Sequence, residues 1–176
     1  MTNGNVVKIT PDPEAKLIMG LIPCANRLYL GVAWPIIQPG VAELAQESLG
    51  EWDEWRVFRE VYGGTMQLYM GYIDKTNTAQ EDKFQEIFVE KLKTPETDYV
   101  GFLILQFLEK SAHIFAAYVM PAYRSSNVLA IGFKYIENEV RKMGAPYISL
   151  STRPDVSGAL QSLGFRAQYM TYRKKL

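Results

Sequence analysis

The strongest constraint on the fold comes from two apolar segments in the second half of the chain. They span Val100–Glu109 and Ala112–Met120, and only the short polar link Glu109-Lys110-Ser111 separates them. A link this short joins antiparallel strands, so the pair predicts a β-hairpin. Both strands are apolar almost without interruption, which is typical of strands in a sheet that is covered on both faces.

A polar turn follows the second strand and opens a long helix. Pro121 bends the chain, Arg124-Ser125-Ser126-Asn127 is polar, and the apolar spacing predicts an amphipathic helix over Val128–Lys142. The first turn of a helix leaves backbone N–H groups unpaired, and the helix dipole adds partial positive charge there. This turn therefore indicates a site for a phosphate-bearing ligand of the nucleotide type.

Three further elements are expected after this helix. They are a strand over Tyr147–Ser151, a short helix over Val156–Leu163 and, after a turn at Gly164-Phe165, a last strand over Arg166–Tyr172. The order β-β-α-β-α-β predicts an α/β (α+β) fold with a mixed sheet. At 176 residues the chain is expected to form one domain over 1–176.

The first half of the chain gives weaker signals, and residues 1–33 are ambiguous. A short strand is conceivable at Val6–Thr10, and Leu28–Ala33 fits either a strand or the start of a buried helix. A helix is expected from Pro35 to Leu49, ending at Gly50.

The segment after Gly50 carries clearer signals. Asp53 is a suitable N-cap for a helix over Glu54–Tyr62 that Gly63-Gly64 ends, and Thr65–Ile73 is expected to be a strand. Residues 74–98 are polar and are expected to form a surface insertion, in which Phe84–Leu92 fits a strand or a helix.

Composition excludes several classes of function. Nineteen basic and nineteen acidic residues give a net charge of zero, which argues against broad binding to nucleic acid. One histidine and the single Cys24 cannot form a zinc site, and one cysteine cannot form an intrachain disulfide, so no metal is expected. No leader is apparent, and the longest apolar run, Gly101–Leu108, is too short to span a bilayer. A cytoplasmic protein without a membrane partner is expected.

Several segments resemble the GNAT superfamily of N-acetyltransferases. They are the run Tyr118–Arg124 at the end of a strand, the helix from Val128, and Ala159–Phe165, which is similar to the family's turn into its last strand. Trp34-Pro35 and Gly64–Tyr69 are similar to small GNAT-like proteins of bacteriophages. The resemblance covers roughly residues 34–176. It implies a mixed, mostly antiparallel sheet flanked by helices on both faces.

The resemblance also implies acetyl-CoA as the acyl donor. In the family, a strand splayed at a bulge pairs with the pantetheine arm, which here implies the backbone of Tyr118, Val119 and Met120. The pyrophosphate loop of the family corresponds to Arg124, Ser125, Ser126, Asn127, Val128 and Leu129. Arg124 fits the family pattern, and Asn127 replaces a glycine. Leu129 departs from the pattern, since the family has a small residue there.

The resemblance implies acetyl transfer to an amine, with His113 in the place of the family's base. Glu109 is a second candidate base. Many members carry a tyrosine that acts as the general acid, but Leu160 stands at that position here, so Tyr123 or Tyr118 is the candidate acid.

Two alternatives stay open at this stage. One is a catalytically inactive GNAT-fold subunit, such as a component of a bacteriophage particle or phage–host complex, with a virion or host protein as partner. The other is a regulatory module that binds acetyl-CoA without turnover. A homo-oligomer is compatible with all three interpretations.

Overall fold

A computed structural model describes residues 16–23, 27–48, 51–74, 99–124, 127–151 and 157–167. The elements are β1 (Lys16–Ile22), α1 (Arg27–Glu47), α2 (Glu54–Tyr62), β2 (Gln67–Asp74), β3 (Tyr99–Leu108), β4 (Ser111–Val119), the short 3-10 helix η2 (Pro121–Tyr123), α4 (Val128–Lys142), β5 (Tyr147–Leu150) and α5 (Ser157–Ser162).

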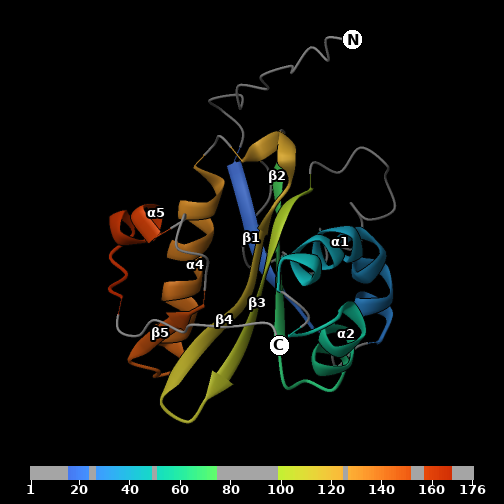
Figure 1. Cartoon of the computed structure of the whole chain (residues 1–176), viewed down its shortest axis with the longest axis horizontal. Coiled ribbons are helices and arrows are strands. Elements are labelled where there is room, and N and C mark those ends of the chain that lie inside the picture. Colours follow the sequence, from blue (N-terminus) through green and yellow to red (C-terminus); the bar gives the residue numbers. More distant parts are fainter. Residues whose placement is uncertain are drawn as a thin grey trace, which may run out of the picture.

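The five strands form one sheet in the order β1-β2-β3-β4-β5. All neighbouring pairs are antiparallel except β4 and β5, which are parallel. Helices α1 and α2 lie on one face of the sheet, and α4 and α5 lie on the other (Figure 1). This arrangement confirms the predicted fold class, a mixed and mostly antiparallel sheet between two helical layers.

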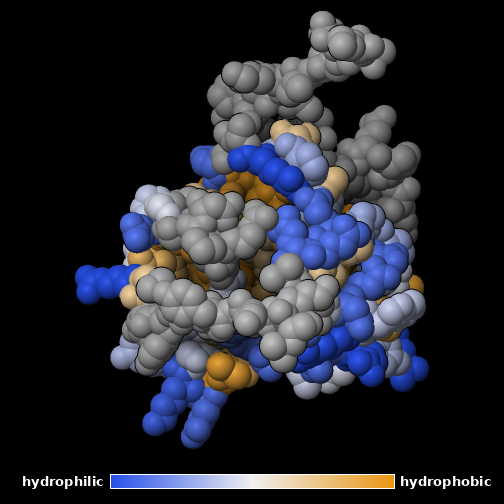
Figure 2. All heavy atoms as spheres, in the orientation of Figure 1, coloured by the Kyte–Doolittle hydropathy of each residue, from blue (hydrophilic) through white to orange (hydrophobic). Residues whose placement is uncertain are grey.

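Each face of the sheet has its own apolar core. On the α1 face, Ile37 and Val57 from the helices pack with Phe102 from β3. On the α4 face, Phe133 and Ile136 pack with strand residues. Residues 100–105 of β3 are all buried, as the uninterrupted apolar run predicts. In the view of Figure 1, the outer side of α1 and α2 is mostly hydrophilic, and hydrophobic side chains show between the two helical layers (Figure 2).

The N-terminal region differs most from the expectation. Strand β1 lies within the ambiguous region, whereas Val6–Thr10 is outside the described residues. Helix α1 begins at Arg27, so Leu28–Ala33 is the start of a buried helix, one of its two expected alternatives. The helix continues through Pro35, where a helix start was expected, and through Pro39. Its buried side includes Leu30, Ala33, Ile37 and Val41. This helical spacing continues across both prolines. The free energy gained by packing in the core therefore outweighs the loss of helix stability that each proline causes, which is about 3 kcal/mol.

The other predicted elements are largely confirmed. Helix α2 has the predicted bounds, and the Arg56 backbone N–H donates to the Asp53 carboxylate at 2.7 Å, as expected of an N-cap. Helix α4 also has the predicted bounds. Arg166 and Ala167 have no regular structure, and the rest of the predicted last strand lies outside the described residues. Phe84–Leu92 also lies outside them.

No helix in the described ranges is long and apolar enough to cross a membrane. Among the same residues, no group of three or more histidine, cysteine, aspartate or glutamate side chains could hold a metal ion.

Candidate functional site

Strands β4 and β5 separate partway along β4. Their pairing covers only Ser111–Ile114 of β4 and ends where Ile114 meets Leu150. The β3–β4 register shifts at the same level, because Leu105 pairs with Ile114 and Ile104 pairs with Ala116. Phe115 is thus an extra residue in β4, which is a β-bulge. Beyond it, no described strand pairs with β4 on the β5 side, and this open edge leads toward the start of α4.

The hydrogen bonds to β3 identify which backbone groups lie on the open edge. The Met120 N–H donates to the Val100 carbonyl at 2.8 Å, so Met120 points its N–H toward β3. In an antiparallel pair, alternate residues point their backbone groups toward the partner. Ala116 and Tyr118 therefore face β3, while Ala117 and Val119 face the open edge. Of the three residues predicted to pair with pantetheine, only Val119 presents its N–H and carbonyl there. Ala117 was not predicted.

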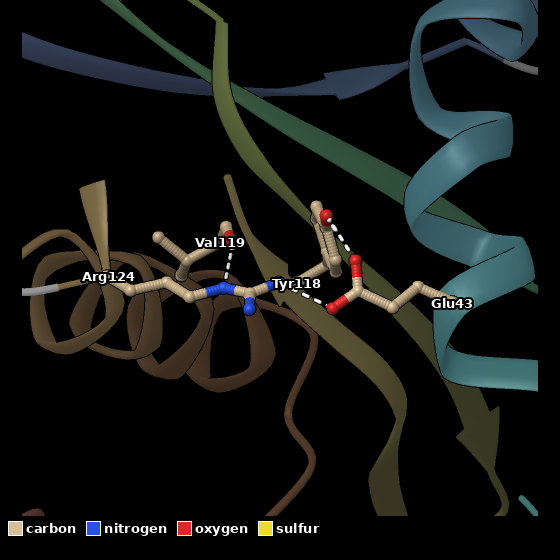
Figure 3. Close-up of polar contacts among 4 residues, drawn as sticks. All are labelled: Glu43, Tyr118, Val119 and Arg124. Atoms are coloured by element: carbon tan, nitrogen blue, oxygen red, sulfur yellow. Dashed lines mark hydrogen bonds and ion pairs between the residues drawn. The ribbon is translucent and has the colours of Figure 1, made fainter. Parts of the chain in front are cut away.

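Three side chains meet beside this edge (Figure 3). The Arg124 guanidinium contacts the Glu43 carboxylate at 2.7 Å, and Arg124 Nε donates to the Val119 carbonyl at 3.1 Å. The Tyr118 hydroxyl donates to the other Glu43 oxygen at 2.7 Å. The guanidinium also lies over the Tyr118 ring, 5.3 Å from its centre. Glu43 comes from α1, far from the other residues in the sequence, and was not predicted.

A close approach of α1 to β4 positions the cluster of Glu43, Tyr118 and Arg124. A Cβ at Gly40 would lie 2.8 Å from two carbons of the Tyr118 ring, so only glycine leaves room for that ring. On its other side, Tyr118 stacks on Phe102 with ring centres 5.5 Å apart. Glu43 follows Gly40 by about one helical turn and so reaches the Tyr118 hydroxyl.

Each member of the cluster favours the charge state of its neighbour. Hydrogen bonds from Arg124 and then from Tyr118 lower the pKa of Glu43 below its usual 4.5. Burial, together with the bond to Glu43, raises the pKa of Tyr118, and the bond to Glu43 raises the pKa of Arg124. Arg124 is therefore a cation, Glu43 an anion and Tyr118 a neutral donor at pH 7. Because the side chains of Arg124 and Glu43 are 49% and 42% exposed, their ion pair contributes at most about 1 kcal/mol.

The lowered pKa of Glu43 predicts a pH dependence of stability. Replacing Glu43 with glutamine is expected to lower the free energy of unfolding at pH 7 by up to about 1 kcal/mol. The folded state binds fewer protons at this carboxyl than the unfolded state, so the contribution is complete above pH 4.5 and disappears as the pH falls through the folded pKa. Urea unfolding of both proteins at pH 7 and pH 3 measures it. An equal difference at both pH values would contradict this account.

An apolar pocket lies on the α4 face beside the open edge. Val119, Val128 and Leu129 line it, with glycines 71, 101 and 132. Leu129 is half-buried and packs against the core of this face. Val128 is buried, and Asn127 is an exposed N-cap without a side-chain capping bond. Ser125 and Ser126 lie outside the described residues.

His113 lies on β4 just before the strands separate. It pairs in register with Ser149 of β5, and its Nδ1 lies 3.0 Å from the Ser149 hydroxyl oxygen. Burial lowers its pKa below 6.5, so the imidazole is neutral at pH 7. His113 and the bulge residue Phe115 flank the point where the edge opens.

The remaining predicted residues lie elsewhere. Glu109 is exposed in the β3–β4 turn, five residues before Ile114 and thus roughly 16 Å along the strand from the start of the open edge. Tyr123 is half-buried at the end of η2, past the end of β4. Leu160 packs against the α4-face core. The structure brings His113 to the start of the open edge and Arg124 to its far end, and does not bring Glu109 to either.

No protein-family model matches the sequence, and no curated protein does. Solved structures with the same fold include a ribosomal-protein-alanine N-acetyltransferase from Brucella melitensis (TM-score 0.58, 10% identity, 92% of this chain and 100% of that one). An aminoglycoside acetyltransferase from a soil metagenome has a similar structure (TM-score 0.57, 11% identity, covering 91% of this chain and 96% of that one). An acetyltransferase from Trypanosoma brucei also has a similar structure (TM-score 0.55, 14% identity, covering 92% of this chain and 100% of that one). At these identities the likeness shows the fold, which is that of the GNAT acetyltransferases.

Proposed function

We propose that this chain is an acyl-CoA-dependent N-acetyltransferase that acts on an amine. The observation that carries the proposal is the open edge of β4 between Phe115 and Val119. Unpaired backbone donors and acceptors inside a sheet are normally satisfied by another strand. An edge that opens within a sheet and points at a helix N-terminus suits an extended ligand with amide groups along its length and phosphates at one end.

The residues along the edge fit the donor. Acetyl-CoA supplies the activated acetyl group as a thioester. Ala117 offers its N–H and carbonyl, and Val119 its N–H, to the amides of the pantetheine arm, while the Val119 carbonyl accepts from Arg124 Nε in the free protein. Arg124, with the start of α4, is suited to hold the pyrophosphate through guanidinium and backbone N–H groups. In this proposal the loop consists of Arg124, Ser125, Ser126, Asn127, Val128 and Leu129.

The direction of the edge determines where transfer would occur. With the phosphates at α4, an extended ligand runs down β4 and must end where β5 closes the edge, at Ile114 and Leu150. His113 is next to this point and neutral at pH 7, so it can accept the proton that the amine loses on attack. The imidazolium that forms when His113 accepts this proton can then donate it to the departing thiolate of CoA. Glu109 and Tyr123 lie away from this point, and the proposal gives them no part in the transfer.

Ligand-induced thermal stabilisation tests the proposal. At about 100 times its dissociation constant, acetyl-CoA is expected to stabilise the protein by roughly 2.7 kcal/mol. For a chain of this length that raises the melting temperature by about 5–10 °C. Arg124→Ala is expected to reduce the shift strongly.

The matched control is Arg141→Ala. Arg141 is an exposed arginine near the other end of α4, and its guanidinium lies 3.9 Å from the Glu137 carboxylate. Its replacement should leave the shift unchanged. No shift at millimolar acetyl-CoA would contradict the proposal and favour a non-catalytic subunit with the same fold.

A further inference from the structure

We propose that Glu43 and Tyr118 form a binding site for a positively charged group of the acceptor, and that the Arg124 guanidinium occupies this site until the donor is bound. The inference deepens the proposed function and rests on it, because the donor's pyrophosphate is what draws Arg124 away. It assigns a role to Glu43 and narrows the class of acceptor.

The contacts of Arg124 show that a guanidinium group fits between Glu43 and Tyr118. A carboxylate oxygen of Glu43 lies 2.7 Å from the guanidinium, and the face of the Tyr118 ring lies 5.3 Å from its central carbon. A carboxylate combined with an aromatic face is a general arrangement for recognising ammonium and guanidinium groups. The second Glu43 oxygen is held by the Tyr118 hydroxyl at 2.7 Å, which fixes the orientation of the carboxylate.

The occupant of this site can be exchanged. The ion pair between Arg124 and Glu43 is nearly half exposed, and such pairs are weak. Arg124 also stands three residues before the N-cap of α4, where the pyrophosphate is proposed to bind. A guanidinium binds phosphate oxygens through two parallel hydrogen bonds, so the phosphates compete directly with Glu43 for it.

Movement of Arg124 would free two groups at once. The Val119 carbonyl loses the bond from Arg124 Nε and becomes available to the donor. Glu43 loses its cation and becomes available to the acceptor. Donor binding therefore prepares the acceptor site, and by linkage the two ligands should bind cooperatively.

The charge at this site indicates which part of the acceptor it holds. The attacking amine must be neutral, whereas a carboxylate stabilises a protonated one. Tyr118 is three residues from Phe115, about 10 Å along the strand from the end of the open edge. The site therefore suits a second, non-reacting cation of the acceptor. The acceptor class is a compound or peptide segment with another positive charge about 10 Å from the reacting nitrogen.

The first experiment tests the cation site without the donor. Methylguanidinium is added to Arg124→Ala and to the double variant Glu43→Gln/Arg124→Ala, and the melting temperatures are compared. We expect it to raise the melting temperature of the single variant relative to the double variant, and methylurea, its neutral analogue, to have no such effect. Equal responses of the two variants would overturn the proposed site. Arg124→Met, which keeps an unbranched side chain, replaces the alanine variant if that variant does not fold.

The second experiment tests the exchange in the unmodified protein. Calorimetric titration with methylguanidinium is carried out with and without saturating CoA. We expect binding to tighten at least about fivefold with CoA, the lower end of typical coupling between sites. Unchanged or weaker binding while CoA itself binds would overturn the exchange and leave the proposed function intact. If CoA does not bind, the proposed function and the exchange both fail, and the first experiment alone decides whether the site accepts a cation.

Discussion

Replacing Gly101 with alanine is expected to lower the free energy of unfolding by about 2–3 kcal/mol. A Cβ at this position would overlap the carbonyl oxygen of Tyr118 and lie 3.2 Å from the Val119 Cα. Both neighbours are backbone atoms of β4, so the strain cannot be relieved by rotating a side chain. Relief requires β4 to move away from β3 at the open edge, and acetyl-CoA binding should weaken as well. Urea unfolding and the acetyl-CoA thermal shift measure the two effects.

Gly31→Ala is the matched control for this substitution. Gly31 is exposed within α1, and a Cβ there would meet no atom within 4 Å. Because alanine is favoured over glycine inside a helix, this variant is expected to gain about 0.5–1 kcal/mol. A Gly101→Ala protein as stable as the original would show that β3 and β4 are not packed this closely.

The second large effect is expected for Val119→Pro. Proline lacks the backbone N–H that Val119 presents on the open edge, and an edge position tolerates this loss because no bond to β3 is broken. Loss of one donor to a ligand amide is expected to cost about 1–3 kcal/mol, which is roughly a 5- to 150-fold loss of acetyl-CoA affinity.

Val119→Ala is the control for Val119→Pro. It removes the two γ-methyl groups of valine but keeps the N–H, so it should retain most of the affinity. Isothermal titration with acetyl-CoA compares the two variants, and urea unfolding confirms that both are folded. Equal affinities would show that the Val119 N–H does not contact the donor.

Elements with strong local signals were predicted with correct bounds. The Asp53 cap and the two following glycines define α2, and the polar turn before Val128 defines the start of α4. By contrast, β1 is specified by its antiparallel pairing with β2, a contact that no local pattern reveals. The sequence left Leu28–Ala33 open between a strand and a buried helix and placed a helix start at Pro35, whereas the core on the α1 face stabilises one helix from Arg27 through both prolines.

The candidate site was predicted in part for the same reason. Arg124 and Val119 belong to one continuous segment with a recognisable pattern. Glu43 lies 81 residues from Arg124 in the sequence, and only the approach of α1 to β4 at Gly40 brings them together. Ala117 was missed because the bulge at Phe115 shifts the register, so the alternation along β4 cannot be read from apolar spacing alone.

Amide hydrogen exchange with and without acetyl-CoA tests the central claim most directly. Ala116 and Tyr118 face β3, so their amides should be protected in both states and serve as internal controls. Ala117 and Val119 face the open edge, so their amides should exchange rapidly in the free protein. On saturation with acetyl-CoA, both should become protected, because the donor occupies the place of a neighbouring strand. Rapid exchange at Ala117 and Val119 in both states, or protection of both before any ligand is added, would contradict this account of the site.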